Sequence, residues 1–313
     1  MIRMISTIML IPTITSANVQ PIKQMLSDIH LRDPFILPVR EESKYYLYGT
    51  GWRLPDGPGF MTYTSRDLKT WEGPFPAFQR PEGFWSDRNY WAPEVHRYKG
   101  NYYMLASFKA KNACRGTQIL ISEKASGPFR SITNGPVTPR DWECLDGTLY
   151  IDKAGKPWMV FCHEWVQVGD GEICAVALSD DLKTTVGKPI LLFRASEALW
   201  VVEIGKEPRG RVTDGPFLHR TSDGALLMLW SSFGKDSYKL AVARSESCQI
   251  TGPWKHEPKP IYENNGGHGM VFRTFEGKLM LVLHQPNRGP DERPRLFTVQ
   301  EKGNTLRISL WSL

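Results

Sequence analysis

The chain has 313 residues, of which 41% are hydrophobic and 23% charged, ordinary values for a globular protein. Its formal charge is only +6 and no basic run is interleaved with aromatic residues, which argues against nucleic acid as a partner. The five cysteines form no CxxC pair, which argues against a zinc site. Beyond the N-terminal segment, no apolar run is long enough to span a membrane.

Residues 1–17 are similar to a secretory signal. One basic residue, Arg3, precedes an apolar run, and the small residues Thr15, Ser16 and Ala17 follow it. This order is typical of a signal peptide that is cut after Ala17, although an irregular or strand-forming N-terminus has the same composition. We therefore expect an exported protein, periplasmic or extracellular, with a single domain over residues 18–313 that acts as a monomer.

The remainder of the chain repeats one pattern five times. In each copy an acidic residue or a histidine precedes a short strand, a turn of small and polar residues follows, and a longer apolar strand comes next. The clearest copy runs from Val212 to Phe233, with its turn at 222–224. Most copies add a third strand. The openings lie roughly 50–70 residues apart, as in propeller blades, at Asp33, Glu94, Asp146, Asp214 and His268.

Radial repetition of small antiparallel sheets protects their strand edges. We therefore predict an all-β protein, a five-bladed β-propeller with its active site at the central channel. Because the first strand of each blade lies nearest the axis, the five opening residues should meet at one end of the channel. Four carboxyl groups and an imidazole are costly to bury together unless they perform chemistry or hold a cation. The alternative is that each acid only caps a local turn.

Such a set of carboxyl groups suits glycoside hydrolysis. One acid stays ionised to activate water, a second is protonated to donate to the leaving oxygen, and a third raises the pKa of the donor by repulsion. Further residues near the openings are candidates for binding sugar, although each has a plainer role in packing or on the solvated surface: Trp85, Trp91, Glu94, His163 and Arg288.

The blade openings resemble those of glycoside hydrolase family 43, five-bladed propellers that include arabinofuranosidases, xylosidases and arabinanases. The matching motifs are Arg32-Asp-Pro-Phe-Ile, Trp91-Ala-Pro-Glu-Val, Leu145-Asp-Gly-Thr-Leu and Thr213-Asp-Gly-Pro-Phe. The resemblance covers nearly the whole chain after about residue 30. It implies that Asp33 is the general base, that Asp146 orients the proton donor and tunes its pKa, and that Asp214 is the donor. His268 matches an axial histidine often associated with calcium; no cofactor is required for the chemistry.

Asp214 departs from the family pattern, in which the donor is usually glutamate. Aspartate is one methylene shorter, which sets its carboxyl group about 1–1.5 Å further back. Three explanations stay open: a narrower pocket that Asp214 still reaches, donation by Glu94, Glu143 or Glu203, or sugar binding without turnover.

The function predicted from the sequence is an inverting glycoside hydrolase of plant-type polysaccharide. We expect exo action on terminal α-L-arabinofuranosyl or β-D-xylosyl residues, because the bulky Phe84-Trp85 loop would close the pocket. The alternatives are an endo-acting arabinanase or xylanase, a non-catalytic carbohydrate-binding propeller whose acids hold calcium, and a retaining propeller enzyme of the fructan-acting kind.

Overall fold

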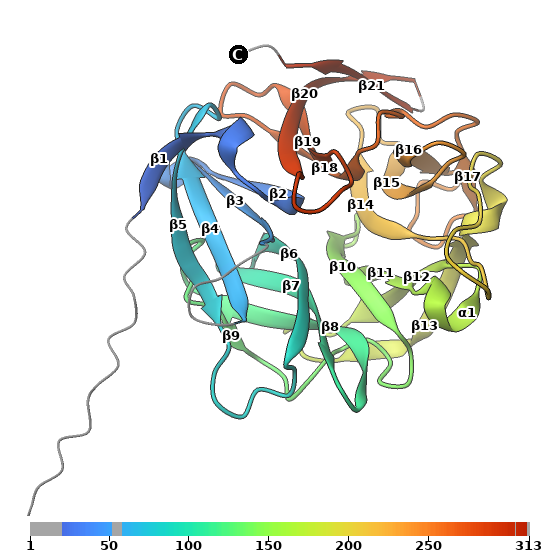
Figure 1. The fold of residues 1–313 in the computed structure, drawn as a ribbon, viewed down its shortest axis with the longest axis horizontal. Helices are drawn as coiled ribbons and strands as arrows, with labels where there is room; N and C mark the ends of the chain where they lie inside the picture. The colour runs from blue at the N-terminus through green and yellow to red at the C-terminus, as the bar shows by residue number, and fades with distance from the viewer. Residues whose placement is uncertain (1–20, 52–57, 304, 312–313) are drawn as a thin grey trace, which may run out of the picture.

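Five antiparallel sheets stand around a common axis in the computed structural model, which describes residues 21–51, 58–303 and 305–311 (Figure 1). The predicted all-β, five-bladed propeller is confirmed. The predicted signal, residues 1–17, lies outside the described residues. Within the described part of the chain, no helix is both long and apolar enough to cross a membrane.

Each blade is a meander in which consecutive strands pair, and the first blade gains an extra edge strand from the N-terminal side. The strands of blade one are β1 (Ile22–Met25), β2 (Arg32–Val39), β3 (Lys44–Thr50), β4 (Gly59–Ser65) and β5 (Thr70–Gln79). Those of blade two are β6 (Arg88–Tyr98), β7 (Asn101–Ala110), β8 (Ala113–Ser122) and β9 (Arg130–Ser131). Those of blade three are β10 (Cys144–Ile151), β11 (Pro157–His163), β12 (Glu172–Leu178) and β13 (Thr185–Arg194).

Blade four contains β14 (Asp214–Arg220), β15 (Leu226–Phe233), β16 (Tyr238–Ser245) and β17 (Trp254–His256). Blade five contains β18 (Gly267–Arg273), β19 (Leu279–Gln285), β20 (Arg293–Lys302) and β21 (Thr305–Leu310). The helical pieces are one turn each: η1 (Leu26–Asp28), η2 (Arg40–Glu42), α1 (Trp165–Val168) and η3 (Ala195–Glu197).

The second strand of a blade is apolar along its length because both of its faces are covered by neighbouring blades. In β15, Met228 and Trp230 pack in a cluster with residues of blade three. The intervening Leu227 and Leu229 pack in a different cluster, with residues of blade five. A continuous apolar run rather than strict alternation is the expected pattern for such a strand.

Blades one and five lie side by side and close the ring (Figure 1). The backbone N–H of Leu31 donates to the carbonyl of Glu292 at 3.3 Å. The ring of Tyr45 stacks on Phe275, with centroids 4.2 Å apart. Since β1 and β21 each pair only within their own sheet, these side-by-side contacts hold blades one and five together.

Every innermost strand carries a β-bulge close to its start. The register against the second strand shifts there in all five blades. One residue at each shift has a positive φ, between 45° and 54°: Asp33, Ala92, Asp146, Gly215 and His268. Bulges bend a strand and re-aim its side chains, and they are common beside active sites. Non-glycine residues with positive φ are strained, so their recurrence at one position indicates a functional constraint.

The bulges correct the alignment of the five openings expected from the sequence. Asp33, Asp146 and His268 occupy the same position of their blades. Glu94 lies two residues after the equivalent position, and Asp214 lies one residue before it. Because neighbouring residues of a strand point to opposite sides and a bulge shifts this alternation, the five side chains do not form one equivalent ring.

The channel is filled just beyond the bulges. The rings of Phe35 and Phe217, from blades one and four, meet across the axis with centroids 6.2 Å apart. The ring of His96 lies 5.1 Å from that of Phe35, and its Nε2 is 3.0 Å from Oε2 of Glu94. We call Phe35, Phe217, Glu94 and His96 the axial plug. The plug separates the bulge end of the channel from its opposite end.

Replacement of Phe35 by alanine should remove the central ring of the axial plug and leave a cavity. Large-to-small changes of a buried phenylalanine lower the free energy of unfolding by about 3–5 kcal/mol, and we expect a loss in that range for Phe35→Ala. Chemical denaturation measures it. Leu310→Ala, at a side chain that is 69% exposed on β21, is the control and should change the free energy by no more than about 0.5 kcal/mol. Equal effects of the two changes would contradict the plug.

Candidate active site at the bulge end of the channel

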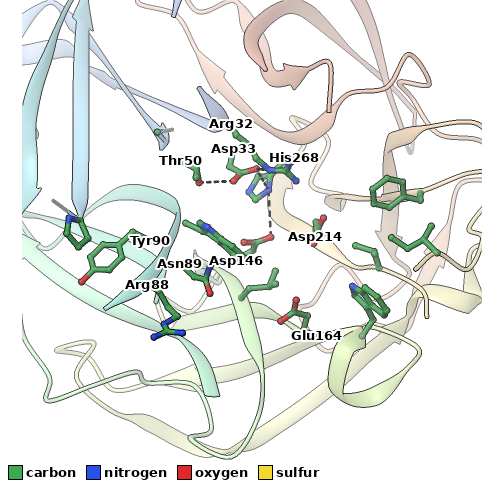
Figure 2. Close-up of a pocket in the computed structure, with 18 of the residues that line it drawn as sticks. Arg32, Asp33, Thr50, Arg88, Asn89, Tyr90, Asp146, Glu164, Asp214 and His268 are labelled. Carbon is green, nitrogen blue, oxygen red and sulfur yellow. Dashed lines mark hydrogen bonds and ion pairs between the residues drawn. The ribbon is translucent and has the colours of Figure 1, made fainter. Parts of the chain in front are cut away.

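A cavity of about 910 Å³ opens at the end of the channel where the five bulges lie (Figure 2). Four carboxylic acids and one histidine line it: Asp33, Asp146, Glu164, Asp214 and His268. Aromatic residues form much of the remaining wall, among them Tyr90, Trp91, Trp165 and Phe233. The cavity therefore combines titratable groups at its base with flat apolar surfaces at its sides.

His268 lies between two of the acids. Its Nδ1 is 3.1 Å from Oδ1 of Asp33 and 3.7 Å from Oδ2 of Asp146. All three side chains come from the positive-φ position of the bulges, in blades five, one and three. The equivalent position in blade four is Gly215, where an added Cβ would lie 2.7 Å from Cγ of His268. Glycine is therefore needed there so that the imidazole can reach both carboxylates.

Asp33 is held in its ionised form. Burial raises the pKa of this carboxyl group, but the positive charges of His268 and Arg32 lower it more, to well below its usual range. Nε of Arg32 lies 3.3 Å from Oδ1 of Asp33, and the hydroxyl of Thr50 donates to Oδ2 at 2.8 Å. Asp33 is consequently a carboxylate at any pH near neutrality.

Asp214 has the opposite preference. Burial and repulsion by Asp146 raise the pKa of Asp214 to about 7. Its Oδ2 accepts a hydrogen bond from the hydroxyl of Tyr238 at 2.9 Å. Near neutral pH, a large fraction of Asp214 therefore retains its proton.

Asp146 is intermediate between these two acids. Burial raises its pKa to about 6, while the charge of His268 acts in the opposite direction. Its Oδ2 accepts a hydrogen bond from the backbone N–H of Gly215 at 2.9 Å, which ties it to the residue next to Asp214. In His268 itself burial lowers the pKa, but Asp33 and Asp146 raise it to about 10, so the imidazole is a cation.

Glu164 enters the cavity from the end of β11, on the side facing Asp214 (Figure 2). Nη1 of Arg115 donates to its Oε2, and the guanidinium of Arg115 lies over the ring of Trp91 at 4.3 Å from the centroid. Burial raises the pKa of Glu164 above its ordinary value, and the charge of Arg115 opposes this rise without cancelling it. Arg115 thus joins an acid and an aromatic ring of the same wall.

The structure brings together Asp33, Asp146, Asp214, Trp91 and His268, as expected from the sequence. It corrects the expectation for Glu94, which lies in the axial plug beside His96 rather than at the cavity wall. The cause is the position of Glu94 after the bulge, two residues further along the channel.

Three other predicted site residues also lie outside the cavity: His163, Arg288 and Trp85. His163 is buried under Trp142, with centroids 4.2 Å apart, and its ring nitrogens contact Glu172 and Gln167. Arg288 is 78% exposed beside Asp291 in the loop after β19.

Trp85 donates its indole N–H to Gln118 and lines a second cavity on blade two. The predicted aromatic closure of the catalytic cavity by Phe84 and Trp85 is therefore not observed.

The other acids considered as proton donors are also elsewhere. Glu143 contacts Nζ of Lys109 at 2.6 Å, and Glu203 pairs with Arg211 at 3.0 Å in a half-exposed loop. Neither lines the cavity. Among the described residues, Glu164 is the remaining carboxyl group besides the three aspartates that does so.

Sequence reasoning missed the residues that set the protonation of the acids. Arg32 was visible as the neighbour of Asp33, within the same motif. Thr50, at the end of β3, and Tyr238, at the start of β16, lie far from any opening motif. The geometry of a propeller could have indicated Thr50 and Tyr238, because the second strand of a blade ends, and its third strand begins, at the same end of the channel as the bulges.

The described residues offer no group of three or more His, Cys, Asp or Glu side chains arranged to hold a metal ion. Calcium takes six to eight oxygen ligands, whereas the histidine at the axis is engaged by two carboxylates that would otherwise be available as ligands. The expected calcium at His268 stays a prediction.

Known proteins resemble the chain over most of its length. The family described as "Glycosyl hydrolases family 43" matches residues 22–303. The extracellular exo-α-(1→5)-L-arabinofuranosidase ArbA of Cellvibrio japonicus (strain Ueda107) is 27% identical over 292 residues, which cover 82% of this chain and 78% of that protein. The extracellular endo-α-(1→5)-L-arabinanase 1 of Bacillus subtilis (strain 168) is 27% identical over 253 residues, covering 76% and 71%. The crystal structure of an endo-arabinase from Bacteroides thetaiotaomicron VPI-5482 superposes with a TM-score of 0.84 at 43% identity, covering 90% of this chain and 98% of that one.

Removal of the charge of Asp146 should lower the pKa of Asp214. In the unmodified protein, burial and repulsion by Asp146 together keep Asp214 protonated up to about pH 7. In Asp146→Asn this repulsion is absent, so Asp214 should lose its proton at a lower pH. NMR titration of ¹³C-labelled aspartate carboxyl groups measures the shift. Asp180→Asn, at a surface acid that is 83% exposed, is the control. An unchanged titration of Asp214 in Asp146→Asn would disprove the coupling.

Proposed function

This chain belongs to glycosyl hydrolase family 43, and we propose that it hydrolyses α-L-arabinofuranosyl linkages within arabinan, with inversion at the anomeric carbon. The observation that supports the proposal most strongly is the opposite protonation of two acids in one cavity. Asp33 is held ionised, whereas Asp214 keeps its proton up to about pH 7. An inverting glycosidase needs both states at the same time.

In the proposed reaction, Asp33 takes a proton from a water molecule as that water attacks the anomeric carbon. The glycosidic C–O bond breaks, and Asp214 gives its proton to the departing oxygen. Asp146 does not touch the reacting atoms. It keeps the proton affinity of Asp214 high by repulsion, and its hydrogen bond with the backbone of Gly215 fixes the strand segment that carries Asp214.

We favour Asp214 over Glu164 as the proton donor, although Glu164 has the longer side chain. Arg115 contacts Glu164 directly, and its positive charge opposes the rise in the pKa of Glu164 that burial causes. Burial and repulsion by Asp146 raise the pKa of Asp214 to about 7, although the hydroxyl of Tyr238, which donates to its carboxylate, acts in the opposite direction. Of the explanations for the short donor, this choice corresponds to a pocket that Asp214 itself reaches.

The size and lining of the cavity support internal cleavage rather than the exo action expected from the sequence. A volume of about 910 Å³ is near the upper end for small-molecule sites, which leaves room for several sugar units. The reason for predicting exo action was an aromatic closure by Trp85, which instead lines a separate cavity. The relatives include both an exo-acting arabinofuranosidase and endo-acting arabinanases.

Both curated relatives are described as extracellular, which supports export of this chain. We also propose that the protein works as a monomer and that the protonated His268 supplies positive charge at the axis without a cofactor.

Linear α-1,5-arabinan tests the reaction and its mode. We expect a mixture of oligosaccharides, a fall in viscosity ahead of the release of reducing ends, and products of inverted anomeric configuration by NMR. Asp33→Asn should lower kcat by about 10²- to 10⁴-fold, because the general base is lost. Asp180→Asn should leave kcat unchanged. Release of arabinose alone would establish exo action, and full activity of Asp33→Asn would overturn the assignment of the base.

The proton donor is identified by leaving-group dependence. With aryl arabino-oligosaccharides, Asp214→Ala should be slow for basic leaving groups and close to normal for acidic ones, which depart without a proton. Glu94→Ala should show no such dependence.

The kcat/KM of the unmodified enzyme should fall as pH rises through about 7, because Asp214 then loses the proton it must donate. A leaving-group effect in Glu164→Ala instead of Asp214→Ala would transfer the role to Glu164.

A further inference from the structure

Blade two carries a second cavity, of about 500 Å³, which takes no part in the proposed reaction. Trp85 forms one wall, the tip of the β7–β8 hairpin forms another, and the segment 134–140 forms a third. We propose that this cavity binds a sugar ring that bears a carboxylate, a uronate unit of a polysaccharide. This inference depends on the proposed function in one respect, namely that the ligand is a polysaccharide.

Trp85 is a fixed aromatic platform. Its indole N–H donates to Oε1 of Gln118 at 2.6 Å, and the buried amide of Gln118 donates in turn to the carbonyl of Thr133 at 2.7 Å. On its inner side the ring packs near Phe84 and Phe108, with centroids 6.2 and 6.4 Å away. The side chain is only half-buried and lines the cavity. Little conformational entropy is lost when a ligand stacks on a ring that is already held.

Two positive charges at the cavity have no internal partner. The side chains of Lys111 and Arg140 are exposed, and among the described residues neither makes an ion pair or a hydrogen bond. The acid in the lining, Asp87, is already neutralised by Arg88, at 2.8 Å from Nε and 3.1 Å from Nη2. Among the side chains that line the cavity, two cations therefore accompany a single, already paired acid.

The polar lining also suits hydroxyl groups. The amides of Asn112 and Asn134 line the cavity and, in the described part of the chain, their side chains form no hydrogen bond. Each can both donate to and accept from a sugar hydroxyl. An aromatic face, two amides and two unpaired cations together fit a pyranose or furanose ring with a carboxylate, because guanidinium and ammonium groups form strong hydrogen bonds with carboxylates. A neutral sugar would leave both cations unused.

Residues that lie close together in the sequence line the second cavity and the catalytic cavity. Trp85 lines the second cavity and Arg88 lines the catalytic one, where Figure 2 places Arg88 beside Asn89 and Tyr90. Three residues span at most about 11 Å even when fully extended. A single branched polysaccharide that carries both uronate and arabinose can therefore reach the two cavities at once, which would direct the enzyme to arabinan attached to an acidic backbone.

Isothermal titration of the full-length protein with trigalacturonate tests the proposal. We expect binding that weakens as salt is raised from about 0.05 to about 0.5 M, since exposed charges are screened. Arg140→Ala and Lys111→Ala should each weaken binding about tenfold, the loss expected for one charge-assisted hydrogen bond. Trp85→Ala should abolish binding and Trp85→Phe should retain most of it.

Arg307→Ala, which removes an exposed arginine of β21 far along the chain from blade two, is the matched control and should bind normally. Arg140 and Lys111 are surface residues, so their variants keep the test decisive if Trp85→Ala does not fold. Three results would each overturn the proposal. Trigalacturonate does not bind; neutral arabinotriose binds equally well and Arg140→Ala weakens that binding too; or neither Arg140→Ala nor Lys111→Ala changes the binding of trigalacturonate. The readout is binding, so it is independent of whether the protein hydrolyses arabinan.

Discussion

The cation of His268, shared between the carboxylates of Asp33 and Asp146, sets the chemistry of the whole site. Buried charges are destabilising unless they are paired, and loss of one partner leaves the others uncompensated. Here the three groups come from blades five, one and three, so the pairing also ties distant parts of the ring together across the axis. The pairing lowers the pKa of Asp33, which lies 3.1 Å from His268 and has Arg32 as a second cation. Burial and repulsion by Asp146 instead raise the pKa of Asp214, which holds its proton most.

The repeated bulge makes this pairing possible. At one position of every blade the backbone adopts a positive φ, and three blades place a charged side chain there. The other two place Ala92 and Gly215, which leave space at the centre. Without the small residue of blade four, the imidazole of His268 would collide with its neighbour. The site therefore depends as much on where side chains are missing as on where they are present.

The sequence predicted the architecture because the repeat is strong: an opening motif, a turn and an apolar strand, five times. It also predicted Asp33, Asp146 and Asp214 as the acids, from motifs that each hold a bulge. It failed for Glu94, because a bulge changes which residues point the same way, and this change is a matter of backbone conformation rather than composition. Arg115 and Tyr238 belong to strands that carry no motif. Arg115, in blade two, reaches Glu164 of the neighbouring blade three, and Tyr238 reaches Asp214 within the sheet of blade four. Trp85 was misplaced for a related reason, since loop composition does not say which of two adjacent hollows a ring faces.

The axial plug has a consequence for how a long substrate is handled. The rings of Phe35 and Phe217 meet across the channel beyond the acids, and the hollow on their other side is separate from the catalytic cavity, so the acids are reached from the bulge end. A polymer cannot pass through the propeller as through a pore. It must lie across the opening of the cavity, with one linkage placed near Asp33. Both fragments then depart by the route through which the intact strand arrived. Successive cuts thus require release and renewed capture, unless contacts outside the mouth retain the strand between them.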